Sequence, residues 1–400
     1  MQEPLRVLFS FPTRLGTTGI GTTAWNQVSG LVALGVDVTL VCGSIERPVP
    51  GARVHAETMR IGGVRVPYRL VGFDRAVTHH DRRAARAVRA LAGRIDVVHA
   101  WPLGGERSLT AARRHGITAL LERPNAHTAF AFEAVAEECR RIGVPVGADS
   151  PHAFDARRLA REEREYASAD ALLCPSEFVA RTHFDRGIPR ERLLRHRYGY
   201  DPLRFSPGPP RDPGSPLSVV FVGLGEPRKG LHTALQAWLD AGLGDDGRFL
   251  ICGSIEPAYR DVLAPMLAHP SVQELGHVSD PGAVMRDCDV LVLPSVEEGS
   301  ALVTYEGRAS GCVLAVSDRS GAPCRHDYDG LVHRAGATDE LQAHFQALAR
   351  DPQLLARLRA ASLAGLDELT WSAAARALLD AYRAGIASRA EASAPALASG

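Results

Sequence analysis

Short runs of apolar residues alternate with longer amphipathic segments along most of the 400-residue chain. Runs of this kind, rich in Val, Leu and Ile, predict strands that are buried on both faces. The segments between them, such as residues 21–35, have the apolar spacing and the closing glycine of helices. This alternation predicts a parallel sheet with helices on both faces. In the first half, the predicted strands are residues 6–11, 37–43, 95–100, 117–122 and 169–176.

The alternation of strands and helices is interrupted at residues 198–216, which are rich in proline and glycine, and a linker is expected there. It then resumes, with predicted strands at residues 217–223, 247–253, 272–276, 289–295 and 312–317. We therefore expect two doubly wound domains, residues 1–200 and 201–385. Residues 387–400 are small and polar, and a disordered tail is expected there. In sheets of this class, ligands bind at the carboxyl ends of the strands.

The composition is typical of a globular cytoplasmic protein and does not by itself indicate a function. Hydrophobic residues make up 45% of the chain, and its formal net charge is zero, so no overall attraction to nucleic acid is expected. The seven cysteines are scattered, which favours buried reduced thiols in a cytoplasmic protein. No apolar run reaches the length of a membrane span, and no signal peptide is evident. An arginine-rich segment, residues 79–95, is either a solvated helix face or a peripheral contact with the inner membrane face.

Lys229 is the only lysine among the 46 Lys and Arg residues. It follows Arg228 in the sequence GLGEPRKG, residues 223–230, between a predicted strand and the next predicted helix. The amides and the dipole at a helix N-terminus already favour an anion, and two cations strengthen that preference. The pair is either a phosphate site or a solvated basic pair; the compact charge of lysine is one that arginine does not reproduce.

Two carboxylates lie near the start of another predicted helix. Glu298 is in the loop after the strand at residues 289–295, and Glu306 lies one to two turns inside the helix that follows. Such carboxylates can be capping charges. They can also bind sugar and ribose hydroxyls, with the backbone amides of residues 299–302 between them facing a diphosphate.

These motifs resemble those of the retaining glycosyltransferases of family 4. That family has a strand ending in V-G and a basic loop ending in K-G, here Gly223 and Lys229-Gly230. It also has P-S-x-x-E-G followed by a second Glu eight positions later, here Glu298 and Glu306. The resemblance implies the GT-B fold, in which two Rossmann-like domains face a central cleft. The resemblance rests on sequence motifs in residues 217–385 and mainly on the order of strands and helices in the first 200 residues. It also implies that the last helix crosses back to the first domain.

The chain departs from the family pattern at several positions. Leu224 stands where the family usually has a phosphate-binding arginine, and Arg228 is the residue that would supply the missing charge. Gly307 and Arg308 interrupt the usual E-A-x-A-x-G, and Tyr198 stands where the family usually has Asn.

The resemblance implies a nucleotide-diphosphate sugar as donor, transfer of its hexose to an acceptor hydroxyl with retention, and no metal or other cofactor. Lys229 and Arg228 would neutralise the diphosphate, Glu298 would hold donor-sugar hydroxyls, and Glu306 would hold the ribose. Further donor contacts are expected from Gly223, Gly299, Ser300, Ala301 and Leu302. The acceptor is open: a glycan, a lipid-linked sugar or a small molecule.

The resemblance also assigns residues of the first domain to the site. Gly19 and Gly21 would let the chain pass close to the diphosphate and the acceptor, and His127 would contact the donor sugar. Arg123 and Asn125 are weaker candidates at the same opening.

Other functions fit the sequence less well. A nicotinamide enzyme lacks the acidic residue that should end the second strand, and the D-C-D at residues 287–289 precedes its strand, at the wrong edge of the sheet for a ligand. A pyridoxal-dependent phosphorylase would need a lysine besides Lys229. A non-catalytic nucleotide-sugar binder and a nucleotide-sugar epimerase on the same scaffold stay open as alternatives.

Overall fold

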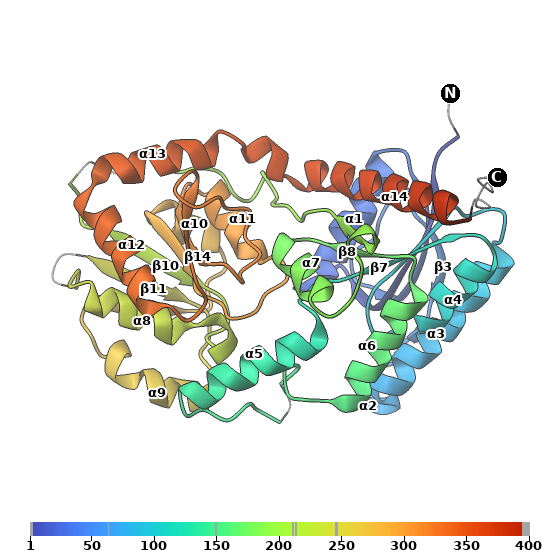
Figure 1. The fold of residues 1–400 in the computed structure, drawn as a ribbon, viewed down its shortest axis with the longest axis horizontal. Coiled ribbons are helices and arrows are strands. Elements are labelled where there is room, and N and C mark those ends of the chain that lie inside the picture. Colours follow the sequence, from blue (N-terminus) through green and yellow to red (C-terminus); the bar gives the residue numbers. More distant parts are fainter. Residues whose placement is uncertain are drawn as a thin grey trace, which may run out of the picture. The chain divides into compact units, whose positions relative to one another are not determined.

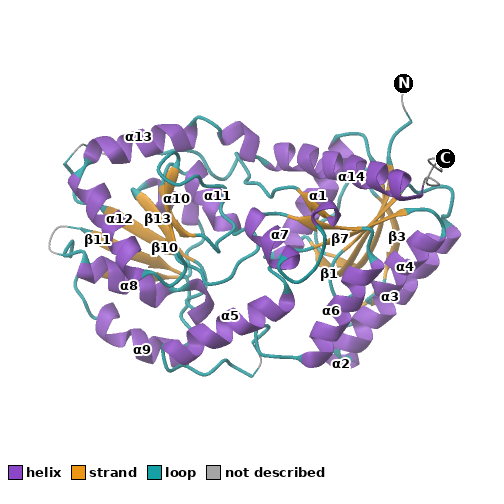
Figure 2. Cartoon of the chain, viewed as in Figure 1, coloured by secondary structure: helices purple, strands orange, loops and turns teal. Residues whose placement is uncertain are grey.

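The computed structural model describes residues 3–62, 64–148, 150–209, 212, 214–244 and 247–393. The chain divides into two compact units. Unit 1 contains residues up to Pro124, Asp155–Tyr198 and the chain from Trp371 onward, and unit 2 contains Asn125–Phe154 and Gly199–Thr370. Each unit has its own parallel sheet, drawn in orange in Figure 2, with helices packed on it.

Unit 1 is built on a seven-stranded parallel sheet with the strand order β3-β2-β1-β6-β7-β8-β9. Its central strands coincide with the apolar runs of the sequence, and residues 7–9 and 97–98 in them are wholly shielded from solvent. The bounds are β1 Arg6–Leu15, β2 Asp37–Ile45, β3 Arg53–Glu57, β6 Val97–Ala100, β7 Thr118–Glu122, β8 Ala171–Cys174 and β9 Leu193–Arg195. A separate hairpin joins β4 (Arg60–Ile61) and β5 (Val64–Arg65).

Helices cover both faces of this sheet. The last helix, α14, packs along α1, and Gly30 permits the close approach because a Cβ there would lie 2.5 Å from Cβ of Ala375. Figure 1 shows α14 in red beside α1. The helices of unit 1 are α1 Ile20–Ala33, α2 Tyr68–Val71, α3 Phe73–Ala90, α4 Glu106–Arg114, α6 Ala156–Ser168, α7 Glu177–Phe184 and α14 Trp371–Ser393.

Unit 2 repeats the architecture with a six-stranded parallel sheet in the order β12-β11-β10-β13-β14-β15. Its strands are β10 Ser218–Val222, β11 Arg248–Cys252, β12 Val272–Gly276, β13 Val290–Leu293, β14 Val313–Ser317 and β15 Gly330–His333. Its helices are α5 Thr128–Arg141, α8 Leu231–Asp240, α9 Pro257–Leu267, α10 Pro281–Arg286, α11 Leu302–Ala309, α12 Thr338–Arg350 and α13 Pro352–Leu363. Unit 2 also contains the short 3₁₀ turns η2 Pro227–Lys229 and η3 Leu366–Leu369, whereas η1 Arg190–Arg192 belongs to unit 1.

The strand order reverses between β1 and β6 in unit 1 and between β10 and β13 in unit 2. Chain segments leave such a switch point in opposite directions, which opens a crevice at the carboxyl ends of the two central strands. In unit 2 the segments that follow β10 and β13 carry the predicted basic loop and Glu298. The topology therefore brings the two motifs to one place.

Two sequence predictions need correction. Residues 387–393 were expected in a disordered tail, but α14 continues to Ser393 because its alanine-rich end is a good helix former and Arg389 bonds Asp170 at 2.7 Å. The rest of that tail, residues 394–400, lies outside the described residues. Residues 125–154 were assigned to the first domain, whereas they are grouped with unit 2.

Candidate functional site

The basic loop after β10 and the acidic loop after β13 are in direct contact. Gly230 has φ +69°, and a Cβ added to it would lie 2.4 Å from the carbonyl oxygen of Pro294. The amide of Val296 donates to the carbonyl of Arg228 at 2.9 Å. The glycine of K-G is thus required by both its backbone conformation and the approach of the second loop.

Lys229 and Glu298, which are 69 positions apart in sequence, meet in an ion pair. The Lys229 Nζ lies 2.8 Å from Glu298 Oε1, and Arg228 Nη1 lies 3.0 Å from Glu298 Oε2. Burial opposes ionisation of Glu298, but the two cations outweigh it and lower its pKa to about 2. The stem of Lys229 runs over Gly223, where an added Cβ would lie 3.4 Å from Lys229 Cδ. Four of the predicted site residues therefore form one cluster.

Arg228 is surrounded by acidic groups. Its Nη2 lies 2.8 Å from Glu226 Oε1, and its Nη1 donates to the carbonyl of Glu297 at 2.9 Å. Glu298 is its third acidic neighbour. This guanidinium is committed to organising the two loops, whereas Lys229 is bonded to one carboxylate oxygen and has further N–H groups to donate. Leu224, which stands at the usual arginine position, is 42% exposed.

Glu297 belongs to this cluster and was missed by the sequence analysis. Its side chain is wholly buried, and its Oε1 accepts a hydrogen bond from the amide of Ala126 at 3.1 Å. Burial raises its pKa, and the nearby Arg228 opposes that shift. The signal in the sequence was the paired acid of P-S-V-E-E-G, because a second buried carboxylate needs a partner.

Glu306 lies half-buried in α11, one turn after the helix begins at Leu302. No hydrogen bond to its carboxylate is found among the described residues, and burial raises the pKa of that carboxyl group to about 7. Its neighbours explain the departures from the family pattern. A Cβ at Gly307 would lie 2.5 Å from Leu291 Cδ2, and the buried Arg308 bonds the carbonyls of Ser362 and Pro323, each at 2.7 Å.

Some polar groups of the segment between Glu298 and Glu306 are hydrogen-bonded within unit 2. The Ser300 hydroxyl lies 2.8 Å from the Tyr305 hydroxyl, and the amide of Ala301 donates to the carbonyl of Ser320 at 3.3 Å. The expectation that the amides of residues 299–302 all face a phosphate is therefore wrong at Ala301. Leu302 is the first residue of α11, and the roles of Gly299 and Leu302 stay predictions.

The two candidate glycines of unit 1, Gly19 and Gly21, differ in their surroundings, and their predicted approach to the diphosphate and the acceptor stays a prediction. Gly19 has φ +68° and precedes α1, and an added Cβ there would meet no atom within 4 Å. Gly21 is packed tightly, because an added Cβ would lie 2.5 Å from the carbonyl oxygen of Arg14. The backbone at Gly19 thus has open space beside it, whereas Gly21 serves the turn.

The residues after β7 separate into two groups. Arg123 is 2% exposed and pairs with Glu162 at 2.8 Å in unit 1, so its guanidinium is turned into the interior and not toward the predicted opening. Asn125 and His127 belong to unit 2. His127 is buried at the start of α5, where its Nδ1 accepts from the amide of Ala129 at 3.2 Å. His127 is therefore a helix cap, and its predicted contact with a sugar stays a prediction.

Unit 1 has a buried carboxylate of its own at the end of β7. Glu122 is wholly shielded and accepts from the Tyr198 hydroxyl at 2.8 Å and from Gln27 Nε2 at 3.1 Å. His99 Nε2 and His196 Nε2 lie 3.2 and 3.1 Å from its two oxygens. Burial opposes ionisation, but the two histidines hold the pKa of Glu122 well below its usual range. The hydrogen bond to Glu122 explains why Tyr198 stands where the family usually has Asn.

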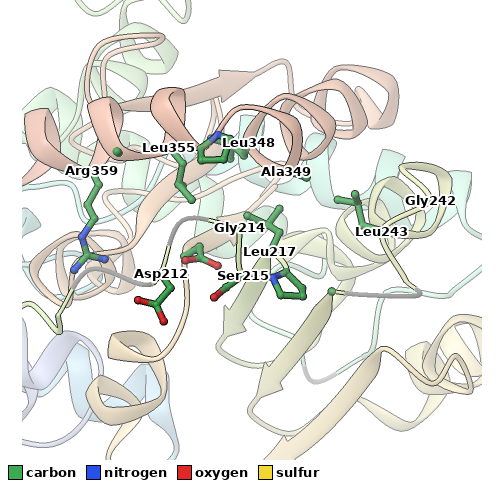
Figure 3. A pocket seen from close by; sticks show the side chains of 15 residues that line it. Asp212, Gly214, Ser215, Leu217, Gly242, Leu243, Leu348, Ala349, Leu355 and Arg359 are labelled. Atoms are coloured by element: carbon green, nitrogen blue, oxygen red, sulfur yellow. The ribbon is translucent and has the colours of Figure 1, made fainter.

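A cavity of about 510 Å³ lies at the opposite edge of the unit 2 sheet, where β10 and β13 begin (Figure 3). Leu217, Leu348 and Leu355 contribute apolar surface to it, and the Arg359 guanidinium at its margin bonds the carbonyls of Gly208 and Gly311. Asp289 of the D-C-D motif lines it and bonds Ser218. These polar groups are engaged within the fold, so the cavity adds no chemistry to the candidate site.

Within the described part of the chain, no three His, Cys, Asp or Glu residues are grouped in a way that would hold a metal ion, and the absence of a metal requirement stays a prediction. None of the described helices combines the length and apolarity of a membrane span. Residues 79–90 of the arginine-rich segment lie in the second half of α3, where Arg82, Arg83, Arg86 and Arg89 are exposed; Arg94, which follows the helix, is exposed as well.

Two family models match the chain. A glycosyl transferase 4-like domain matches residues 18–199, and glycosyl transferases group 1 matches residues 216–351. The colanic acid biosynthesis glycosyltransferase WcaL of Escherichia coli is 30% identical over 40% of this chain and 42% of that protein. The D-inositol 3-phosphate glycosyltransferase of Rhodococcus erythropolis is 27% identical over 71% of this chain and 66% of that protein. The chain thus spans less than two thirds of both relatives.

Solved structures share the fold. Sucrose-phosphate synthase from Thermosynechococcus elongatus has a TM-score of 0.69 at 17% identity, covering 95% of this chain and 98% of that chain. The Anabaena protein HepE in complex with UDP-glucose has a TM-score of 0.61 at 16% identity, covering 94% of this chain and 98% of that chain. At such identities the likeness concerns the fold, which is GT-B as predicted. The two family models, together with this shared fold, show that the chain belongs to family 4 of the glycosyltransferases.

Proposed function

We propose that this protein transfers a hexose from a nucleotide-diphosphate donor to an acceptor hydroxyl, with retention of configuration and without a metal ion. The contact between Lys229 and Glu298 at the switch point of unit 2 is the observation that carries the proposal. It places a cation with unused N–H groups next to a carboxylate, where a diphosphate and a sugar could bind side by side. The relatives are named as glycosyltransferases, and HepE is named in complex with UDP-glucose.

In this proposal Lys229 binds the diphosphate of the donor. Negative charge grows on the leaving diphosphate as its bond to the sugar breaks, so a fixed cation lowers the barrier more than it tightens ground-state binding. Arg228 acts indirectly, since it is held by three acidic side chains and fixes the loop that carries Lys229. The acceptor hydroxyl attacks the anomeric carbon, the bond to the diphosphate oxygen breaks, and the acceptor proton passes to that departing oxygen.

The two motif glutamates bind hydroxyl groups in this proposal. When the diphosphate occupies Lys229, Glu298 exchanges an ionic partner for donor-sugar hydroxyls, which keeps its buried carboxylate satisfied. Glu306 accepts hydrogen bonds from the ribose. No hydrogen bond to the Glu306 carboxylate is found among the described residues, and its raised pKa is that of a carboxyl group lacking such donors.

We propose that the arginines of α3 attract an anionic membrane surface or the phosphate of a lipid-linked acceptor. Arg82, Arg83, Arg86 and Arg89 are exposed on one helix. Each basic side chain near an anionic surface adds roughly 1 kcal/mol of attraction. Sedimentation with vesicles of anionic and of neutral phospholipid tests this, and equal binding to both would contradict it.

Calorimetric titration with UDP-, GDP-, ADP- and TDP-sugars, with and without EDTA, tests the proposed function. We expect one nucleotide to bind and EDTA to change nothing. Slow hydrolysis of that donor then separates an enzyme from a nucleotide-sugar binder. Absence of binding to every donor by folded protein would contradict the proposal, and binding without transfer or hydrolysis would favour the non-catalytic alternative.

A further inference from the structure

Helix α5 and the loop before it follow a strand of unit 1 in sequence, yet they are built into unit 2. Val144, which lies just beyond the helix, is buried in the hydrophobic core of unit 2, and Ile142 packs against the same core. The helix also packs on the 3₁₀ turn that contains Arg228 and Lys229. Figure 1 shows α5 beside α9, in the same unit.

A buried polar network anchors the C-terminal half of α5. Glu138 Oε1 lies 2.7 Å from His232 Nε2 in α8, and Arg141 Nη2 lies 2.7 Å from the same carboxylate oxygen. The other ring nitrogen of His232 is 2.5 Å from the Tyr259 hydroxyl in α9. Burial opposes ionisation of Glu138, but His232 and Arg141 lower its pKa to about 2. The ionised Glu138 joins α5 to His232 of α8, and His232 in turn joins Tyr259 of α9.

A second set of contacts anchors the N-terminal end. The amide of Ala126 donates to the buried Glu297, whose backbone carbonyl and side chain both hold Arg228. The guanidinium of Arg319 lies 5.3 Å from the ring centre of Phe130 in the first turn of α5. His127 therefore has anchored residues on both sides of it, and one of those anchors is the immediate neighbour of Glu298.

We propose that residues 125–141 form a fixed wall of the donor site in unit 2, and that Glu138 and Glu297 are positioning residues that hold His127 against the donor sugar. This inference rests on the proposed function. Because both ends of the segment are fixed to the unit that carries Lys229, the sugar contact and the diphosphate contact keep one spacing. Unit 1 supplies the connection to the segment but none of the anchors named here.

The proposal separates two parts of donor affinity. A free nucleoside diphosphate uses Lys229 and Glu306 and gains nothing from His127. The sugar of the intact donor gains from His127 only while the helix is anchored. Loosening α5 should therefore weaken nucleotide-sugar binding and leave diphosphate binding unchanged. A general loss of folding would weaken both.

The test compares the wild type with Glu138→Leu, Glu138→Gln, His127→Ala and the Glu138→Leu/His127→Ala double variant. Calorimetry with UDP and UDP-glucose, and with the matching GDP, ADP and TDP pairs, gives the affinity increment due to the sugar. We expect Glu138→Leu to reduce that increment about tenfold, with the diphosphate affinity within twofold of the wild type. Glu138→Gln keeps an oxygen acceptor for His232 and should recover most of the increment. Glu274→Leu, which breaks the exposed pair with Arg260 in the same unit, should change neither affinity.

The double variant decides between positioning and general damage. If Glu138 acts through His127, adding His127→Ala to Glu138→Leu should cost no further affinity, whereas independent effects would multiply. Equal loss of UDP and UDP-glucose affinity in the folded Glu138→Gln variant, or no loss in any Glu138 variant, would overturn the inference alone. If the wild type binds none of the four pairs, the proposed function fails and the inference fails with it.

Discussion

Two buried carboxylates, Glu122 in unit 1 and Glu298 in unit 2, lie at the carboxyl ends of parallel strands on the same kind of fold, yet they are used differently. Glu122 is wholly shielded, and its contacts are with a tyrosine, a glutamine and two histidines that face inward. Glu298 is 9% exposed and is held by Arg228 and Lys229. A fully enclosed carboxylate contributes to the fold, whereas a carboxylate that keeps some exposure and is held by a cation with spare N–H groups can exchange partners with a ligand.

The difference is reflected in how each group would respond to a ligand. Glu122 has no route to exchange its partners without opening the core of unit 1. The side chains of Lys229 and Glu298 are 15% and 11% exposed, so a diphosphate can reach Lys229 without opening a hydrophobic core.

The largest expected effect is on the stability of unit 1. Glu122→Ala leaves buried donors on Gln27 and Tyr198 without an acceptor and removes the partner of two histidines. We expect the free energy of unfolding to fall by about 3–5 kcal/mol, as when one partner of a buried pair is removed. Urea denaturation at neutral pH measures this, with Glu122→Gln as the milder control. A loss below about 1 kcal/mol would mean that Glu122 is not structural.

Lys229→Met should affect turnover rather than folding. Methionine keeps the apolar stem over Gly223 but removes the charge that would face the leaving diphosphate. Turnover should fall about 10²–10³-fold, with a melting temperature close to that of the wild type. Arg260→Met, in the exposed pair with Glu274, is the matched control and should keep full activity. Normal turnover in Lys229→Met would exclude the assigned role.

Glu306 should make both stability and donor affinity depend on pH. Its pKa is raised to about 7 in the folded protein, so above the unfolded value near 4.5 its ionisation opposes folding. Glu306→Gln should therefore increase the free energy of unfolding by about 1–3 kcal/mol at pH 8 and leave it unchanged at pH 4. Donor affinity of the wild type should rise as pH increases from 6 to 8, because hydroxyl groups bind the ionised form better.

Matched urea curves at the two pH values, together with calorimetry of the wild type at pH 6 and pH 8, check this. A donor affinity that is flat across that range would show that Glu306 does not bind the ribose.

The smallest expected effect concerns the contact between the two loops. Gly230→Ala adds a Cβ at positive φ and against the Pro294 carbonyl, whereas Gly242→Ala adds one at the same φ of +69° with no atom within 4 Å. Each should lose about 1–2 kcal/mol from the backbone conformation. Only Gly230→Ala should also weaken donor binding, because it separates Lys229 from Glu298. Equal donor affinity in the two variants would show that the close approach is not needed.

Much of the fold and the ionic core of the site can be predicted from the sequence. The buried runs give the central strands because parallel strands covered on both faces have no polar positions to mask the pattern. Both motifs follow predicted strands, so Lys229 and Glu298 are expected at the carboxyl ends of strands. That these two strands are neighbours at one switch point is seen only in the strand order of the folded sheet. The edge strand β3 is not predicted from the sequence, because three of its five residues are exposed and it lacks a buried apolar run. Strands as short as β9 have too few residues to show a periodic pattern.

The remaining parts depend on contacts distant in sequence. The orientation of Arg123 is decided by Glu162, and the role of Tyr198 by Glu122. The assignment of α5 to unit 2 depends on Glu138 meeting His232, 94 positions later. The charge of Arg228 alone predicts a contact with the phosphate, which stays a prediction, whereas its three acidic neighbours are seen only when the loops are folded.

The most direct test of the central claim uses the fact that the chain has one lysine. An amine-directed acetylating reagent can label only Lys229 and the α-amino group, so mass spectrometry reads the reactivity of Lys229 against an internal reference. If Lys229 binds the diphosphate, its labelling should slow when UDP, or whichever diphosphate calorimetry selects, is bound, and the corresponding nucleoside should have no effect. Labelling of Lys229 at an unchanged rate with the diphosphate at saturation would contradict the account.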